Sequence, residues 1–243
     1  MNVQDLDSER IPRHIAIILD GNGRWAKQHG KTRQQGHLVG ADNVETISDA
    51  LIEMGVKYFT VYAFSTENWK RAEDEVSYLM GLLKRYLIQN RKDAIRRKIR
   101  IRVLGDVSRL SPDLRKLIQS IEEDTKDFTN FNLQFAINYG GRDEILRAVR
   151  RIAADAVEGR LSGEELTEDL VASYLDTRGI PDPDLLIRTS GELRLSNFLL
   201  WQIAYAELYF TKKYWPDFST SDLETAILDY ASRERRYGGR KSK

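Results

Sequence analysis

Residues 15–25 read IAIILDGNGRW, and this stretch decides how the rest of the chain is interpreted. Its four consecutive apolar residues, 16–19, are typical of a strand buried on both faces of a parallel sheet. Asp20 ends the run, a Gly-Asn-Gly turn follows, and Arg24 opens a short helix that Gly30 ends. The stretch therefore predicts a strand, a glycine-rich turn and a helix in immediate succession.

An acidic residue between a buried strand and a helix start suits an anion and metal site. Glycines let backbone N–H groups approach a ligand, and a helix N-terminus favours negative charge. Asp20 could hold a divalent cation, and Arg24 could bind phosphate oxygens. A tight turn closed by the Asp20 side chain accounts for the same residues, because turns favour Asp, Asn and Gly. This stretch alone leaves both interpretations open.

The composition sets limits on the fold and on the partners. The chain has 243 residues, enough for one large α/β domain or two small ones, and no cysteine for disulfides or thiolate metal sites. Its 38 basic and 37 acidic residues nearly balance, so the net charge suggests no nucleic acid partner. No apolar run approaches the ~20 residues of a transmembrane helix. The polar N-terminus is unlike a signal peptide, so we expect a cytoplasmic protein.

Short apolar runs alternate with longer amphipathic segments. We expect strands near residues 16–19, 57–64, 99–104, 131–137, 184–188 and 206–210. We expect helices from Arg24 to Gly30, up to Met54, from 74 to 98, from Pro112, from 142 to 157, after Thr167, and after a capping box of Ser221 and Glu224. The alternation predicts a single α/β domain, a six-stranded mostly parallel sheet flanked by helices. We place this domain at residues 13–240, after a flexible N-terminal tail at 1–12.

Polar groups follow most of the expected strands. In parallel sheets ligands bind outside the carboxyl ends of the strands, so we expect these groups on one rim. They are Asp20, the cluster 65–71, Asp106, the turn 138–142 and Arg188. The arginines that suit phosphate oxygens are Arg24, Arg33, Arg71, Arg188 and Arg194. The rim favours a diphosphate-bearing substrate with a divalent metal, although no Walker A or dinucleotide motif is present.

Long, ordered motifs across residues 12–240 resemble the signature regions of the cis-prenyltransferases, most closely the undecaprenyl diphosphate synthases. They are HIAIILDGNGRWAK, the Gly-His pair at 36–37, YAFSTENWKR, NYGGR, DLLIRTSGELRLSNFLLWQIAYAELYF, WPDF and RERRYGG. The resemblance implies an apolar product tunnel beside the sheet, Mg²⁺ as cofactor and a homodimer. It also implies repeated condensation of isopentenyl diphosphate onto an allylic diphosphate, farnesyl diphosphate being expected. The product would be a long-chain cis-polyprenyl diphosphate such as undecaprenyl diphosphate, the lipid-carrier precursor for cell-wall synthesis.

The resemblance also implies roles for individual residues. Asp20 matches the essential metal-binding aspartate, and Asn68 matches the position assigned as proton acceptor. Substrate-binding positions are matched by Gly21, Asn22, Gly23, Arg24, Trp25, Arg33, His37, Ser65, Thr66, Glu67, Trp69, Arg71, Arg188, Arg194, Leu195 and Ser196. Glu207 matches a second acidic metal residue. Residues 236–238 match a motif that reaches the active site of the other subunit in relatives.

Two positions depart from the family pattern. Leu193 stands where some members have a metal-binding histidine, and Ala72 stands where many have proline, which would leave the 65–75 loop more mobile. The role of Asn68 also needs a physical adjustment. A neutral amide is a poor base, so we expect Asn68 to orient a diphosphate oxygen or a water that takes the proton.

The tunnel would begin near Asp20 and run between the sheet and its helices. We expect its wall to include Ala63, Leu79, Leu83 and Leu87. Phe131, at the opposite end of the sheet, is either the floor of the tunnel or an ordinary core residue.

Three other readings remain. Residues 91–102, RKDAIRRKIRIR, hold seven basic groups and one acid, which suggests peripheral contact with an anionic membrane or a solvated helix face. The chain could also be a non-catalytic subunit of the same fold, or a synthase of shorter cis-prenyl chains.

Overall fold

One six-stranded sheet organises residues 3–233, the part of the chain that the computed structural model describes. The strands are β1 (His14–Ile18), β2 (Tyr58–Ser65), β3 (Ile99–Leu104), β4 (Phe131–Tyr139), β5 (Leu185–Arg188) and β6 (Glu207–Phe210). Their order across the sheet is β3-β4-β2-β1-β5-β6, and every pairing is parallel. The predicted fold class, a single α/β domain built on a parallel sheet, is therefore confirmed.

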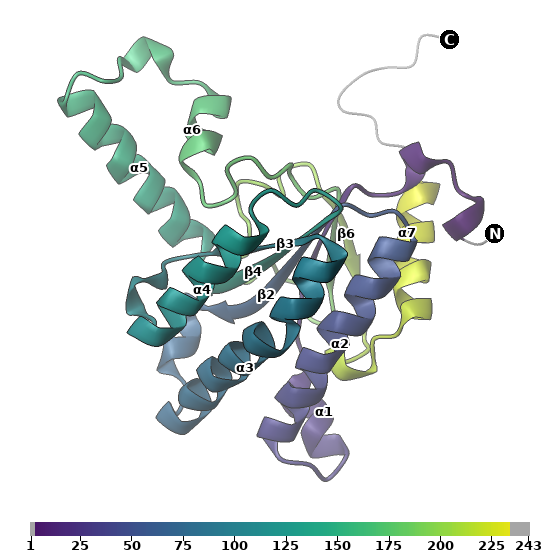
Figure 1. Ribbon diagram of the computed structural model, residues 1–243. Helices are drawn as coiled ribbons and strands as arrows, with labels where there is room; N and C mark the ends of the chain where they lie inside the picture. The colour runs from purple at the N-terminus through teal and green to yellow at the C-terminus, as the bar shows by residue number, and fades with distance from the viewer. Residues whose placement is uncertain (1–2, 234–243) are drawn as a thin grey trace, which may run out of the picture.

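Seven α-helices connect the strands within the described residues. They are α1 (Asn22–Gln28), α2 (Arg33–Glu53), α3 (Glu73–Arg97), α4 (Pro112–Thr125), α5 (Gly141–Val157), α6 (Glu168–Tyr174) and α7 (Thr220–Ser232). Short 3-10 turns lie at Val3–Asp5, Ser8–Arg10, Thr66–Lys70, Val107–Arg109, Gly163–Glu165 and Trp215–Asp217. The helices α2, α3 and α4 lie side by side on one face of the sheet, whereas α5 and α6 project away from it (Figure 1).

The β1 strand lies in the middle of the sheet, between β2 and β5, and all of its residues are buried. Ile15 and Ile17 belong to the larger core, which the α2, α3, α4 and α7 helices cover. Ala16 and Ile18 belong to a second core on the other face, where the segment 198–203 packs. Burial on both faces explains the continuous apolar run from which this strand was predicted.

The start of α7 differs from the prediction. The helix begins at Thr220 and its N-cap is Ser219, whose Oγ accepts a hydrogen bond from the backbone N–H of Asp222, while Asp222 accepts one from the N–H of Ser219. The predicted capping box of Ser221 and Glu224 is thus wrong by two residues. The 3-10 turn that ends at Asp217 brings the chain into the helix earlier than the polar pattern suggested.

Some of the segment predicted as a flexible tail contacts the core. Val3 is buried against the larger core, and the Arg10 guanidinium donates a hydrogen bond to the carbonyl oxygen of Ala231 at 2.5 Å. Residues 236–238, which were matched to a motif that acts across subunits, lie outside the described residues.

Candidate active site

Asp20 lies just beyond the carboxyl end of β1 and is fixed there by its backbone. Its N–H donates to Thr189 Oγ1 at 3.0 Å, and the Thr189 hydroxyl donates back to the carbonyl oxygen of Asp20 at 2.7 Å. The next residue, Gly21, has φ +103°, and a Cβ atom there would lie 2.6 Å from the Tyr214 ring. The glycine is therefore required both by the backbone conformation and by the close approach of Tyr214.

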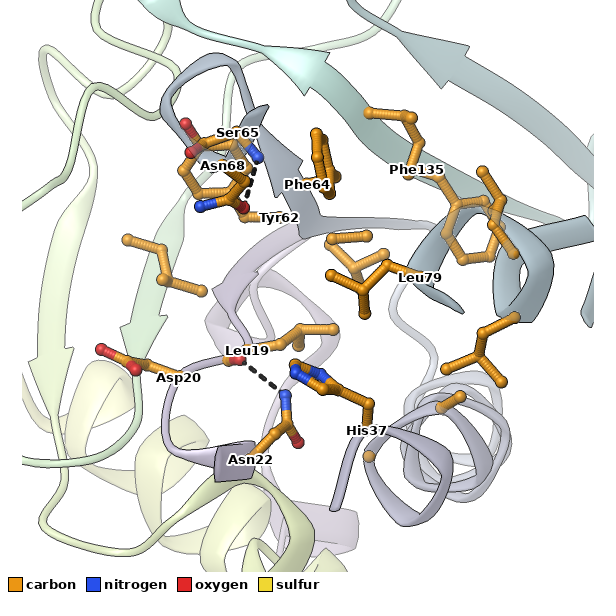
Figure 2. A pocket seen from close by; sticks show the side chains of 18 of the residues that line it. Leu19, Asp20, Asn22, His37, Tyr62, Phe64, Ser65, Asn68, Leu79 and Phe135 are labelled. Atoms are coloured by element: carbon orange, nitrogen blue, oxygen red, sulfur yellow. Dashed lines mark hydrogen bonds between the residues drawn. The ribbon is translucent and has the colours of Figure 1, made fainter. Parts of the chain in front are cut away.

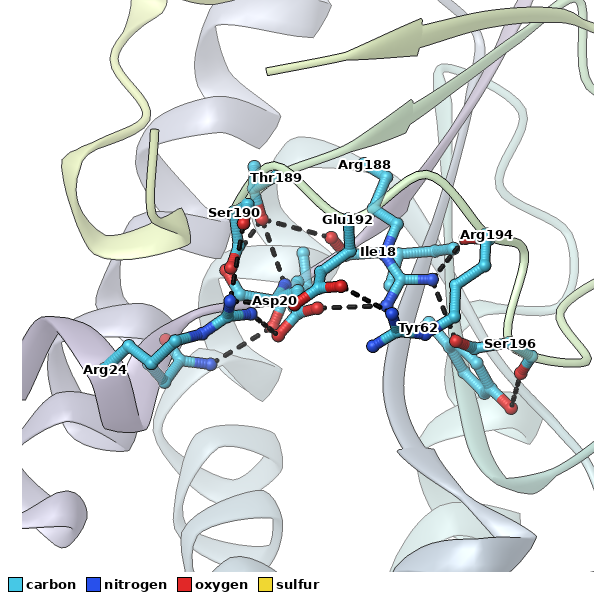
Figure 3. Close-up of polar contacts among 12 residues, drawn as sticks. Ile18, Asp20, Arg24, Tyr62, Arg188, Thr189, Ser190, Glu192, Arg194 and Ser196 are labelled. Carbon is cyan, nitrogen blue, oxygen red and sulfur yellow. Dashed lines mark hydrogen bonds and ion pairs between the residues drawn. The ribbon is translucent and has the colours of Figure 1, made fainter. Parts of the chain in front are cut away.

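The Asp20 carboxylate lies between two arginines (Figure 3). Oδ1 accepts from Arg24 Nη2 and Oδ2 accepts from Arg188 Nη2, both at 3.0 Å. The Arg188 side chain is only 4 % exposed, and its other terminal nitrogen donates to Ser196 Oγ at 2.8 Å and to the carbonyl oxygen of Arg194. Arg188 Nε is buried without a hydrogen-bond partner. The site thus holds a fixed guanidinium with capacity for one more acceptor.

Glu192 joins two of the predicted phosphate-binding arginines. Its Oε1 accepts from Arg24 Nη1 at 2.9 Å, and its Oε2 accepts from Arg194 Nη1 at 2.5 Å. The hydrogen bond and charge of Arg194, with those of Arg24, lower the pKa of Glu192. Sequence reasoning missed Glu192, although it lies between Arg188 and Arg194 in one of the motifs that carry the family resemblance.

A second carboxylate, that of Glu75 on α3, gathers three more predicted residues. It accepts from Arg33 Nη1 at 2.7 Å and from Arg71 Nη1 at 2.8 Å, and His37 Nε2 lies 3.7 Å away. Burial lowers the pKa of His37 to about 4, and the charges of Arg71 and Arg33 act in the same direction. His37 is therefore neutral at pH 7, and its ring can donate or accept a hydrogen bond there.

The 65–71 segment is folded against the sheet. The N–H of Ser65 donates to Asn68 Oδ1 at 3.0 Å, which completes a capping box around the 3-10 turn. Trp69 Nε1 donates to Asn138 Oδ1 at 2.6 Å, and Glu67 accepts from Asn197 Nδ2 at 3.1 Å. Because Asn68 Oδ1 is engaged by the backbone, the amide nitrogen is the group that Asn68 can offer to a ligand.

Asn22 is accommodated by glycines on α2. A Cβ atom at Gly36 would lie 2.3 Å from the carbonyl oxygen of Asn22, and one at Gly40 would lie 2.2 Å from Asn22 Oδ1. Asn22 Nδ2 donates to the carbonyl oxygen of Leu19 at 3.2 Å, so the side chain is locked beside Asp20. Gly36 therefore has a packing role, making room for Asn22, that sequence reasoning did not identify.

A cavity of about 620 Å³ lies between the sheet and the helices α2 and α3. Its polar end is formed by Asp20, Asn22, His37, Ser65, Glu67, Asn68, Arg71, Arg188, Arg194 and Ser196, all predicted site residues. Its other end is apolar and includes Leu79, Met80, Leu83, Tyr86 and Phe135. In Figure 2 Asp20, Asn22 and Asn68 lie at one end of the cavity, and Leu79 and Phe135 lie toward the other.

Ala63 opens the wall of this cavity. It lies on β2, in the middle of the sheet, yet it is exposed, and the register slips between Tyr62 and Phe64 to give a β-bulge. Bulges redirect side chains next to active sites. Ala63, Leu79 and Leu83 line the cavity as predicted.

The two remaining tunnel residues do not line the cavity. Leu87 and Phe131 are each 1 % exposed and belong to the larger core. In the described residues the deep end is instead bounded by Tyr86 and Phe135, whose rings meet edge to face with centroids 5.4 Å apart.

Other predicted site residues also lie outside the lining of the cavity. They are Gly21, Gly23, Arg24, Trp25, Arg33, Thr66, Trp69, Leu195 and Glu207. Trp25 is buried, stacks on His29 and donates from Nε1 to Asp217 at 2.7 Å. Arg24 contacts the polar end through its ion pair with Asp20. Arg33 is connected to it through Glu75, the carboxylate that Arg71 and His37 also contact.

Comparison with known proteins decides the family. A sequence model described as putative undecaprenyl diphosphate synthase matches residues 18–238. The chain belongs to the undecaprenyl diphosphate synthase family. It is 51 % identical over 228 residues to an isoprenyl transferase of Agrobacterium fabrum, covering 94 % of this chain and 92 % of that one. It is 50 % identical over 237 residues to an isoprenyl transferase of Rhizobium meliloti, covering 98 % and 96 %.

Solved structures agree with this assignment. Lavandulyl diphosphate synthase from Lavandula x intermedia, in complex with dimethylallyl diphosphate, superimposes with a TM-score of 0.92 at 38 % identity, covering 95 % of this chain and all of that one. A probable undecaprenyl diphosphate synthase from Campylobacter jejuni gives a TM-score of 0.78 at 34 % identity, covering 93 % and 98 %. As a member of this prenyltransferase family, the protein transfers prenyl groups, and the resemblance seen in the sequence is confirmed.

The family implies a divalent metal, and Asp20 fits one. Mg²⁺ is commonly held by one or two carboxylates together with substrate phosphates and waters. The Asp20 carboxylate is 26 % exposed and lies at the polar end of the cavity. Within residues 3–233 no three His, Cys, Asp or Glu side chains form a complete metal cluster. Asp20 therefore suits a cation that arrives with a diphosphate.

Glu207 is not brought together with Asp20 within one chain. It starts β6 and pairs in register with Leu185 at the amino end of β5, whereas Asp20 follows the carboxyl end of β1. Its carboxylate forms an ion pair with Arg233 Nη1 at 2.6 Å. A role for Glu207 in the metal site remains a sequence-based hypothesis.

Proposed function

We propose that the protein condenses isopentenyl diphosphate repeatedly onto an allylic diphosphate, farnesyl diphosphate as primer, with cis double-bond formation. The product would be a long-chain polyprenyl diphosphate such as undecaprenyl diphosphate, a lipid-carrier precursor for cell-wall synthesis. The observation that carries this proposal is that one cavity has a polar end with Asp20 and Arg188 and an apolar other end. A prenyl diphosphate has the same two parts, a charged diphosphate and an apolar hydrocarbon that grows.

The allylic diphosphate would bind where Asp20, Asn22 and His37 meet. Breaking its C–O bond places negative charge on the departing diphosphate. Arg24 would turn from Glu192 to that anion. Bound Mg²⁺ would supply electrostatic stabilisation of the leaving diphosphate, with Asp20 as its protein ligand.

The isopentenyl diphosphate would bind to Arg188, Arg194 and Ser196. Arg188 is already oriented by Asp20 and by Ser196, so little conformational freedom is lost when a phosphate oxygen takes the free Nε donor. The amide nitrogen of Asn68 would orient the diphosphate oxygen or water that takes the proton, because Asn68 Oδ1 is held by Ser65.

The hydrocarbon would occupy the apolar end of the cavity. Burying each methylene contributes roughly 0.8 kcal/mol, which would hold the intermediate between condensations. The cavity volume of about 620 Å³ is that of a pocket for a drug-sized ligand, so it favours the alternative of a shorter product unless α2 and α3 move apart.

Product analysis tests these possibilities together. The protein is incubated with farnesyl diphosphate, labelled isopentenyl diphosphate and Mg²⁺, and the products are separated by length. A long ladder supports the proposal and a short one supports the alternative. The absence of any labelled polyprenyl product would favour a non-catalytic subunit.

We also propose a homodimer formed through α5 and neighbouring apolar residues. The exposed apolar side chains there are Leu146, Val149, Val157 and Leu166. Val157 is 89 % exposed, and such side chains on a projecting helix suit a second copy of the chain. Light scattering would give twice the chain mass for the wild type and one chain mass for Val149→Asp.

The proposed location is cytoplasmic, with peripheral contact at an anionic membrane. No helix in residues 3–233 is long and apolar enough to span a bilayer. In the basic run Arg91, Arg96 and Arg97 form ion pairs with carboxylates. Of the other four basic residues, Arg100 and Arg102 are half-buried, and the exposed Lys92 and Lys98 are the proposed contacts.

A further inference from the structure

A second cavity, of about 880 Å³, lies at the edge of the sheet away from Asp20. It is bounded by the edge strand β3, by the helix α4 beside it and by the connection at 176–178 (Figure 1). Arg100 and Arg102 are two residues apart on β3, so their side chains leave the same face of the sheet and both line this cavity. Two residues of the basic run at 91–102 are thus directed into a cavity.

The charge of this cavity is strongly positive. Six basic side chains line it: Arg100, Arg102, Arg115, Lys116, Lys126 and Arg178. Three acidic side chains line it as well, two of which form ion pairs with basic side chains, while the third, Glu122, lies within the fields of Arg102, Arg178 and Arg100. Asp176 receives two hydrogen bonds from Arg147, Glu122 accepts from the N–H of Val103 at 2.8 Å, and Glu123 pairs with Lys126.

Five of the six cations therefore have no ion pair with a carboxylate in the described part of the chain. Elsewhere in residues 3–233 many arginines are paired, including Arg91, Arg97 and Arg147. Of these five, Arg100 and Arg102 are half-buried, and like charges at half-buried positions are unfavourable without a nearby anion.

The lack of a carboxylate partner is clearest at Arg102 and Arg100. The Arg102 guanidinium donates only to neutral carbonyl oxygens, those of Arg178 and Asp176, each at 2.9 Å. Burial lowers the pKa of Arg102, and the charges of Arg100 and Arg178 add to this effect. Arg100 Nε is buried and has no hydrogen-bond partner. Both groups would be stabilised by an acceptor with negative charge.

We propose that this cavity, defined by Arg100, Arg102, Arg115, Lys116 and Arg178, binds a phosphate-bearing anion at a site separate from the Asp20 cavity. Guanidinium forks match the oxygens of a phosphate in pairs, and the arginines here come from three different segments, β3, α4 and the connection at 176–178. The phosphate comes from one of two sources, free diphosphate in solution or the headgroup of an anionic phospholipid. The two cavities share no lining residue, so occupation of one does not fill the other.

Equilibrium dialysis with labelled inorganic diphosphate tests the free source. The variants are Arg115→Ala combined with Lys116→Ala, and Arg178→Ala, because all three side chains are exposed and their truncation leaves the core intact. Lys57→Ala, an exposed lysine outside both cavities, is the matched control. We expect the wild type and the control to bind diphosphate in this cavity in addition to the sites near Asp20, and the cavity variants to bind that additional diphosphate roughly tenfold or more weakly.

Vesicles test the lipid source. Sedimentation with phosphatidylglycerol vesicles, beside neutral phosphatidylcholine vesicles, is compared for the same proteins. Loss of either diphosphate or phosphatidylglycerol binding in the cavity variants supports the proposal and identifies the source. Unchanged binding of both in the cavity variants would overturn it.

The outcome is distinguishable from a failure of the proposed active site. Arg24→Ala combined with Arg194→Ala weakens only the site near Asp20. If that variant binds diphosphate as the wild type does while the cavity variants do not, the second cavity stands and the proposed active site falls.

Discussion

The Asp20 carboxylate and the Arg188 guanidinium form an ion pair of 3.0 Å across the carboxyl ends of β1 and β5. The two strands pair in register, Ile18 beside Arg188, so the sheet itself sets this contact. Because Arg188 is already held in position, it can bind a diphosphate with little further loss of conformational entropy. The pair links the proposed metal ligand to the proposed isopentenyl diphosphate site.

Replacement of Arg188 or Arg194 is expected to change the KM values of the two substrates unequally. Arg188→Ala and Arg194→Ala should raise the KM for isopentenyl diphosphate more than the KM for the allylic primer. Each variant removes charge-assisted hydrogen bonds of ~1.5–3 kcal/mol. Steady-state kinetics with each substrate varied in turn measures the effect, and Arg24→Ala is the matched comparison for the allylic side. Equal changes in both KM values would mean that the arginines were assigned to the wrong substrate.

The small side chain of Ala63 is expected to leave room for the growing product. Ala63→Leu places a larger side chain at the bulge, where the cavity passes from its polar to its apolar end, and should accumulate short products. Phe135→Ala should lengthen them, because Phe135 bounds the deep end. Chromatography of the labelled products measures the product length for both variants.

Phe131→Ala is the control for that experiment. Phe131 is 1 % exposed and lies outside the cavity lining, so its truncation should cost ~3–5 kcal/mol of stability without moving the product distribution. Longer products from Phe131→Ala would restore it as the floor of a tunnel.

His14 makes stability depend on pH. It is fully buried between the carbonyl oxygen of Pro181 and Thr60 Oγ1, and burial lowers its pKa to about 4. Between pH 6.5 and about 4 the unfolded chain binds a proton that the folded chain does not, so stability falls as the pH falls. The expected loss from His14 is roughly 3 kcal/mol across this window. Urea unfolding at several pH values measures it.

His14→Gln separates this effect from that of His37, whose pKa is also lowered to about 4. The variant should lose part of the acid dependence and keep the remainder. A pH profile parallel to that of the wild type would show that His14 does not titrate in this way.

Membrane contact is expected to be weak and sensitive to salt. Lys92→Ala with Lys98→Asn, in which asparagine suits the positive φ of 56° at residue 98, should reduce sedimentation with anionic vesicles. Binding that persists at high salt, or in this double variant, would contradict an electrostatic contact through residues 92 and 98.

Much of the fold could be read from the sequence because local patterns determine it. A strand buried on both faces needs a continuous apolar run, and the turn after Asp20 needs a glycine at φ +103°. The parallel topology then places Asp20 and Arg188 on one rim without knowledge of any contact. Asn22, His37 and Ser196 at the polar end of the cavity were expected from the family resemblance instead, and Asp106 and the turn 138–142, which topology also placed on the rim, do not line the cavity.

The contacts that were missed depend on tertiary structure. Glu192 and Glu75 each bind one arginine that is near in sequence and one that is distant; the distant pairs are Arg24 with Glu192 and Arg33 with Glu75. No periodicity reveals such pairs. The burial of Phe131 outside the cavity depends on the placement of Tyr86 and Phe135 on facing elements, which composition alone does not define.

The most direct test of the account is turnover by Asp20→Ala in the assay with farnesyl diphosphate, labelled isopentenyl diphosphate and Mg²⁺. Arg188 keeps its bonds to Ser196 and Arg194, so the variant should fold, which circular dichroism and a thermal melt verify. Asp20→Asn, which keeps the size of the side chain without its charge, serves as the second variant, and excess EDTA on the wild type should reproduce the loss. We predict that both variants retain the fold and lose nearly all polyprenyl product. Wild-type product formation by folded Asp20→Ala, or by the wild type in EDTA, would contradict the central claim.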